Sequence, residues 1–258
     1  MYAVLGGIYG ALLSVMNLFN AQLSAVYGNW GSTVMIHAVG LLVLLPLAFT
    51  WGRPKGHAPW YLYGGGLIGI VTVTCCNLAI GGIGVTANLV IMLLGQLTCS
   101  TLIDQFGLFG ARQVKLSASR LVSLLVIAAG DLVMLLWAGS SAGEGNTSTL
   151  LAVLTSFLSG FSMVFARISN ARLAEKSGLG FSTVMNYVTG LAGSFLIFAC
   201  MGLHLETAFP APGQSITIYL GGAMGALAIF LCNMVTPKLS TLHSFPVSGS
   251  RGIMSSGI

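Results

Sequence analysis

The chain has 258 residues, of which 55% are hydrophobic and only 6% are charged. A soluble domain carries roughly 25% charged residues, so this composition excludes an ordinary soluble protein and predicts a chain embedded in lipid. The net charge of +5 comes from ten Lys and Arg residues against five Asp and Glu residues. No basic patch outside the apolar runs is combined with stacking aromatic residues, so we do not expect nucleic-acid binding.

Apolar runs long enough to cross a membrane follow one another along the chain. A spanning helix needs about 20 residues, and a strand with open edges cannot satisfy its backbone in lipid. The segments between the runs are short and rich in Gly, Pro, Ser or charge. We therefore predict an all-α integral membrane protein with about eight transmembrane helices, at 2–23, 32–51, 60–81, 84–103, 119–138, 149–170, 181–203 and 215–236.

Two blocks of the chain, 20–42 and 170–192, are related in sequence. Asn-Ala-x-Leu opens both blocks, and Ser-Thr-Val-Met occurs at 32–35 and again at 182–185. The first unit would hold five spans, so the second unit would enter the membrane from the opposite side. This arrangement predicts an inverted-topology repeat, a typical transporter architecture.

The repeat divides the chain into three parts. We expect a first five-span unit at 1–140, a second, inverted three-span unit at 149–241, and a non-spanning tail at 242–258. The tail contains Pro, Gly, Ser and Arg251 where the first unit has its fourth span, so we interpret it as a truncation or frameshift relative to a ten-span ancestor.

The distribution of charge predicts the orientation. With the N-terminus in the cytoplasm, all ten basic residues fall at or near the cytoplasmic side, while the other side receives Glu144 and Glu206. Cytoplasmic loops are enriched in Lys and Arg. A multi-pass protein with a cytoplasmic N-terminus is therefore expected.

Several short motifs resemble the YdcZ-type family of the drug/metabolite transporter (DMT) superfamily. They are Asn20-Ala21-Gln22-Leu23, Gly65-Gly66 with Gly69, Gly95-Gln96, Asp104-Gln105-Phe106-Gly107 and Pro237-Lys238-Leu239. The resemblance implies a bacterial inner-membrane protein with five spans per unit that transports a small metabolite or drug. Small relatives that expel cationic drugs place a glutamate in the first span; this chain has none there.

The function that these patterns favour is secondary transport of a small solute by alternating access, with proton coupling as one option and facilitated diffusion as another. The alternative is a non-transporting membrane partner or a lipid-translocating accessory subunit. An enzyme is not expected, because the four histidines are dispersed and no catalytic motif occurs. No cofactor or metal ion is expected, and the partners are the lipid bilayer, the solute, optionally protons, and optionally a second copy of the chain in a homodimer.

Asp131 is the only acidic residue well inside a predicted span. A charge there costs roughly 2.5–3.5 kcal/mol on insertion scales, so we expect the carboxyl group to be protonated or paired. It would serve proton coupling or attract a cation, or it is an acid tolerated near the outer interface.

The other candidates are polar residues within spans, each of which either lines a pathway or packs against a neighbouring helix. Arg167 replaces Asn17 in the second unit and either binds an anionic group or extends to the lipid headgroups. His37 and Tyr187 occupy equivalent positions. The predicted solute or ion pathway comprises Asn17, Asn20, Gln96, Asp131, Asn170, Asn77, Asn233, Arg167, Asn186, Tyr187 and His37.

Overall fold

The fold is all-helical over the part of the chain that the computed structural model describes, residues 2–51, 56–110, 113–114, 116–138, 148–206 and 209–242. No strand occurs in these residues. The long helices are α1 (Tyr2–Trp51), α2 (Gly65–Phe106), α3 (Ala118–Ala138), α4 (Thr149–Ser177), α5 (Leu179–Cys200) and α6 (Leu220–Leu242). Short 3₁₀ helices are η1 (Trp60–Gly64), η2 (Leu108–Gly110) and η3 (Ile216–Tyr219).

Five helical stretches of the described chain are long and apolar enough to cross a membrane. They are Gly7–Pro46, Trp60–Phe106, Thr149–Ser177, Leu179–Cys200 and Ile216–Met234, and a shorter apolar stretch covers Leu121–Met134. Four of these stretches exceed the roughly 20 residues that a span needs, and the fifth, Ile216–Met234, has 19 residues. The expectation of an all-α integral membrane protein is confirmed at this level.

Glycines break the two longest helices. Gly28 in α1 has φ 75° and ψ 165°, and Gly84 in α2 has φ 78° and ψ 169°. Residues with a side chain rarely adopt this conformation, so glycine permits a one-residue turn at each point. As a result, α1 consists of helical segments 2–27 and 29–51, and α2 of segments 65–83 and 85–106. Gly178, at the position equivalent to Gly28 in the repeat, makes the same kind of turn between α4 and α5, with φ 99° and ψ 151°.

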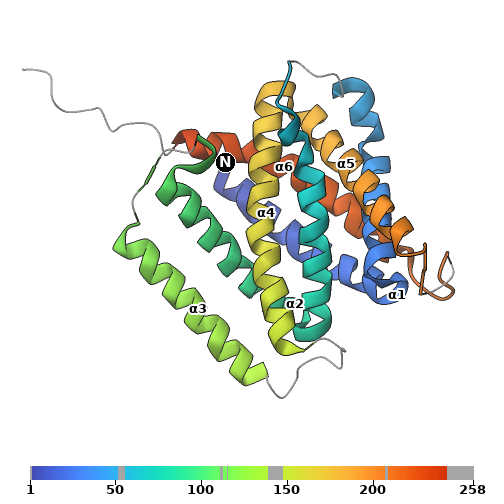
Figure 1. The fold of residues 1–258 in the computed structure, drawn as a ribbon, viewed down its shortest axis with the longest axis horizontal. Helices are drawn as coiled ribbons and strands as arrows, with labels where there is room; N and C mark the ends of the chain where they lie inside the picture. The colour runs from blue at the N-terminus through green and yellow to red at the C-terminus, as the bar shows by residue number, and fades with distance from the viewer. Residues whose placement is uncertain are drawn as a thin grey trace, which may run out of the picture.

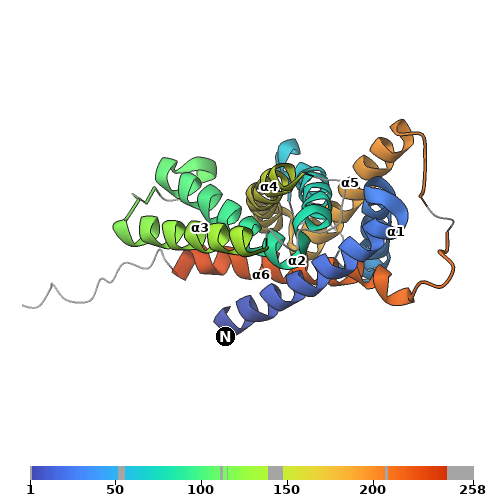
Figure 2. The ribbon, with the colours of Figure 1, turned by 90° about the horizontal axis from the view of Figure 1, so that it is seen from below.

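The helices pair across the two predicted units. The most extensive contact joins α2 to α4, and the next joins α1 to α6. Figure 1 shows α4 alongside α2, with α6 beside the first segment of α1. Helix α5 contacts both α1 and α2, while α3 lies at the edge of the bundle against α2 (Figures 1 and 2). Each unit is therefore packed largely against the other.

Small residues allow α2 and α4 to approach closely. A Cβ atom added at Gly160 would lie 1.9 Å from the Met92 carbonyl oxygen, and one at Gly95 would lie 2.3 Å from that of Phe157. Hydroxyl groups join the same interface, since Ser156 Oγ donates to the Asn88 carbonyl oxygen at 2.9 Å. This is the small-residue packing typical of helices in lipid, where close backbone approach replaces the hydrophobic effect.

Some predictions concern residues outside the described part. The tail at 243–258, and the loop residues Arg53, Lys55 and Glu144 used for the orientation, are among them. Gly10 and Ser14 in the first segment of α1 are both exposed, because no described residue of another helix covers this face.

Candidate functional site

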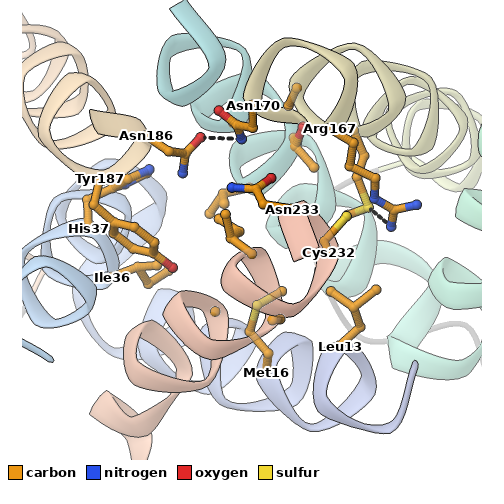
Figure 3. Close-up of a pocket in the computed structure, with 18 of the residues that line it drawn as sticks. Leu13, Met16, Ile36, His37, Arg167, Asn170, Asn186, Tyr187, Cys232 and Asn233 are labelled. Carbon is orange, nitrogen blue, oxygen red and sulfur yellow. Dashed lines mark hydrogen bonds between the residues drawn. The ribbon is translucent and has the colours of Figure 1, made fainter. Parts of the chain in front are cut away.

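A cavity of about 100 Å³ lies between α1, α2, α4, α5 and α6. Its wall contains residues from both predicted units, because α1 and α2 belong to the first and the other three helices to the second. Most of the polar residues predicted for the pathway meet here, as the close-up in Figure 3 shows for several of them. The structure places these predicted residues in the wall: Asn20, His37, Arg167, Asn170, Asn186, Tyr187 and Asn233.

The equivalent asparagines Asn20 and Asn170 make equivalent contacts with glycines. A Cβ atom added at Gly221 would lie 2.1 Å from Asn20 Oδ1, and one added at Gly65 would lie 2.1 Å from Asn170 Oδ1. Glycine is required at both points because any side chain would displace the amide. The two asparagines differ in their hydrogen bonds. Asn170 Nδ2 donates to Asn186 Oδ1 at 2.8 Å, whereas Asn20 Oδ1 is buried without a partner.

His37 and Tyr187 face each other where α1 meets α5. Their ring centroids are 5.9 Å apart. A Cβ atom added at Gly190 would lie 2.2 Å from the His37 ring, and one at Gly40 would lie 2.0 Å from the Tyr187 ring. His37 Nδ1 donates to the carbonyl oxygen of Thr33 at 2.8 Å, so this nitrogen carries a proton. The His37 ring therefore occupies the space that a side chain at Gly190 would need, and the Tyr187 ring occupies the space that a side chain at Gly40 would need.

Arg167 brings a positive charge to the end of the cavity near Cys232 (Figure 3). Its Nη1 donates to Gln96 Oε1 at 2.8 Å, and its Nη2 donates to Met163 Sδ at 2.8 Å. The guanidinium carbon lies 5.1 Å from the centroid of the Tyr9 ring. These contacts hold the guanidinium group of Arg167 against residues of α2, α4 and α1.

Four predicted pathway residues do not line the cavity. Gln96 lies behind Arg167, as its acceptor. Asn77 is buried and donates from Nδ2 to Asn29 Oδ1 at 3.2 Å. Asn17 is buried one helical turn from Asn20, and its Nδ2 has no partner.

Asp131 is the fourth of these residues. It lies on α3, at the edge of the bundle, and is not part of the cavity wall. The residue is 5% exposed, and neither carboxyl oxygen has a hydrogen-bond partner among the described residues. It therefore cannot touch a solute held in this cavity.

The sequence analysis missed an apolar face of the cavity. Tyr9, Leu13 and Met16 line it from α1 and lead to Asn20, and Met163 and Cys232 add sulfur atoms from α4 and α6. The spacing 9, 13, 16 and 20 places these residues on one helical face, and this signal was present in the sequence.

One of three comparisons with known proteins gave a match. A family model described as "Putative inner membrane exporter, YdcZ" matches residues 1–133 and 151–248. A comparison with curated proteins and one with solved structures each gave no match. The matched residues make up most of the chain, and they include both units that pack around the cavity. The chain therefore belongs to the YdcZ-type inner membrane exporter family of the DMT superfamily.

Proposed function

We propose that the protein is a secondary transporter that exports a small solute across the inner membrane through the cavity between its two units. The proposal rests on the composition of the cavity wall. Both units contribute buried amides to this wall, and they do so from equivalent helices. Sites at the interface between repeats are typical of secondary transporters. The description of the family supports export as the direction.

The proposal includes eight spans and an inverted repeat. Helices α1 and α2 would each supply two spans, separated at Gly28 and Gly84, and α3, α4, α5 and α6 would supply one each. The exchanged contacts, Gly65 with Asn170 and Gly221 with Asn20, support a pseudo-twofold relation between the units. If the units exchange conformations, a state open to one side has a mirror state open to the other. The basic residues of the sequence support a cytoplasmic N-terminus.

A bulky side chain placed in the cavity tests the route. Gly69 lines the cavity, and a Cβ atom there would have no other atom within 4 Å, so Gly69→Phe fills the space without a clash at the backbone. Gly81→Phe is the matched control, since Gly81 lies on the same helix, is exposed and has equally free surroundings.

The measurement is untargeted mass spectrometry of the growth medium of cells that express each variant. We expect at least one metabolite to accumulate in the medium with the wild type and with Gly81→Phe, and not with Gly69→Phe. Equal export by Gly69→Phe would exclude this cavity as the route. An unchanged medium with folded wild-type protein would favour a non-transporting partner.

Proton coupling through Asp131 is a separate part of the proposal. Its buried carboxyl group without a partner supports a group that exchanges a proton, since an unpaired charge is costly in lipid. Because Asp131 is remote from the cavity, coupling would pass through α2. Asp131→Asn is expected to abolish export driven by a pH gradient in vesicles while leaving exchange at equal pH intact. A pH-driven flux equal to that of the wild type would remove Asp131 from the mechanism.

A further inference from the structure

We propose that the solute is a small organic anion whose carboxylate, or an equivalent oxyanion, binds Arg167, and which also carries a hydroxyl or N–H donor. This inference rests on the proposed function, because it assigns a class of substrate to the same cavity.

The charge of the cavity wall is the first argument. Among the described residues that line the cavity, Arg167 is the only one with a permanent charge, and none is Asp or Glu. A cationic solute would meet this guanidinium without any acid to compensate the repulsion. In a bundle surrounded by lipid, the attraction between opposite charges is much stronger than in water. The wall therefore favours an anion and disfavours a cation.

The hydrogen bonds of Arg167 are the second argument. A guanidinium has five N–H donors, and a carboxylate matches two of them at once. Here the partners are the amide oxygen of Gln96, the sulfur of Met163 and the face of the Tyr9 ring, all of which are neutral. The Nε of Arg167 is buried and has no hydrogen-bond partner among the described residues. The guanidinium group is thus held in place. None of these partners carries a negative charge, and among the described residues its Nε–H has no acceptor.

A second polar group defines the rest of the solute. Asn233 is 2% exposed, and its Oδ1 has no hydrogen-bond partner in the part of the chain that the structure describes. In Figure 3 it lies between the Asn170–Asn186 pair and Cys232, on the way to Arg167. A buried acceptor without a partner is unfavourable, and a donor on the solute would satisfy it. Leu13, Met16 and Ile229 supply an apolar wall for a compact carbon skeleton.

Cys232 offers a direct readout of occupancy. It lines the cavity, and the Tyr9 side chain lies beside both Cys232 and Arg167. We would label the wild-type protein in phosphatidylcholine vesicles with N-ethylmaleimide and quantify the modification of each cysteine by peptide mass spectrometry. Cys200 is exposed at the end of α5 and lies outside the cavity, so it serves as the internal reference.

Three probes with one carbon skeleton separate charge from shape. They are 2-hydroxy-3-methylbutanoate, its neutral amide, and the cationic amino alcohol valinol. We expect the acid to slow labelling of Cys232 at least fivefold at a concentration at which the amide and valinol have no effect, and labelling of Cys200 to stay constant. Equal protection by the amide or valinol would overturn the inference, as would protection by none of the three.

Variants on one helix test the role of Arg167. Arg167→Gln should remove the protection by the acid, whereas Arg167→Lys, which keeps the charge, should retain part of it. Arg172→Gln is the control, because Arg172 also lies on α4 but donates to the carbonyl oxygen of Phe109 outside the cavity. Full protection in a folded Arg167→Gln variant would contradict the proposal. If that variant does not fold, the three wild-type probes and Arg167→Lys still decide the question.

Three further outcomes distinguish a lipid headgroup from a free solute, and a failure of the anion site from a failure of the transport proposal. If phosphatidylglycerol in the vesicles slows labelling without any added acid, the oxyanion belongs to a lipid headgroup and the solute site is overturned. If Gly69→Phe blocks export but the acid never protects Cys232, transport stands and the anionic class fails. If the acid protects Cys232 but no metabolite is exported, the anion site stands and the transport proposal fails.

Discussion

The first segment of α1 and helix α4 are related in sequence but have different surroundings. Gly160 on α4 is pressed against the backbone of α2, where an added Cβ would lie 1.9 Å from the Met92 carbonyl oxygen. Gly10, the equivalent residue of α1, has no neighbour within 4 Å of such an atom. The second segment of α2 covers this face of α4. In the described chain, no helix covers the equivalent face of α1. A pattern of small residues thus permits close packing, but the partner helix decides whether it occurs.

The same two helices differ in charge. At the positions of Asn17 and Arg167, one helix carries a neutral amide and the other a guanidinium that lines the cavity. The two helices therefore differ in the charge that they carry at this position. If the proposed anion site is right, this one difference selects the charge of the solute.

The largest effect is expected from a side chain at Gly160. Gly160→Leu should drive α4 away from α2, and overpacking of this kind costs roughly 1–3 kcal/mol or more. Gly10→Leu should stay within about 0.5 kcal/mol, as substitutions at exposed positions usually do. Thermal unfolding in detergent, followed by tryptophan fluorescence, measures both. Similar losses in the two variants would contradict the packing described for α1 and α4.

Somewhat smaller and nearly equal losses are expected at Gly66 and Gly222. An added Cβ would lie 2.0 Å from the Asn186 carbonyl oxygen at Gly66, and 2.4 Å from that of Ile36 at Gly222. Alanine at either site should lower stability by roughly 1–3 kcal/mol. The control is Gly69→Ala, where the added Cβ meets no atom within 4 Å. If only one of the pair is sensitive, the two units are not packed in equivalent ways.

Asn170→Ala should be more destabilising than Asn20→Ala. The first change breaks the 2.8 Å hydrogen bond to Asn186 Oδ1, and such bonds between membrane helices contribute about 0.6 kcal/mol on average. The second removes an oxygen that has no partner among the described residues, so no hydrogen bond of this atom is lost and the loss of stability should be smaller. The melting temperatures of the two variants provide the comparison. A reversed order would mean that Asn20 has acquired a partner in the membrane.

A small effect is also expected at Asn17. Its Nδ2 is buried and has no partner among the described residues, so Asn17→Ala loses no hydrogen bond from this atom. The free energy of unfolding should change by less than about 1 kcal/mol. Protection of Cys232 by 2-hydroxy-3-methylbutanoate should also persist, in contrast to Arg167→Gln. Loss of that protection would place Asn17 in the solute site.

Much of the fold could be predicted because hydropathy and glycine are local signals. The runs at 2–23 and 32–51 anticipated the two segments of α1, although the break at Gly28 is a single residue rather than a loop. The short turn was hidden because φ near +75° is a property of the backbone, and glycine in apolar helices also serves close packing.

The site was predictable in part for a different reason. Buried amides such as Asn170 and Asn233 stand out in an apolar sequence, and most of them do meet in the cavity. Asp131 stands out equally, yet it lies on α3 at the edge of the bundle, because depth along a helix does not determine which neighbour covers it. The pairing of Arg167 with Gln96 depends on how α4 packs against α2, which no local pattern reveals.

The most direct test of the account is disulfide cross-linking between the exchanged pairs in native membranes. With the five native cysteines replaced by alanine and a protease site inserted between the units, one variant would carry Gly65→Cys with Asn170→Cys. A second variant would carry Gly221→Cys with Asn20→Cys. Because each glycine lies against the amide of its partner, the account predicts that both variants stay joined after proteolysis until they are reduced. A cross-link at only one pair, or at neither, would contradict two units packed against each other around a shared cavity.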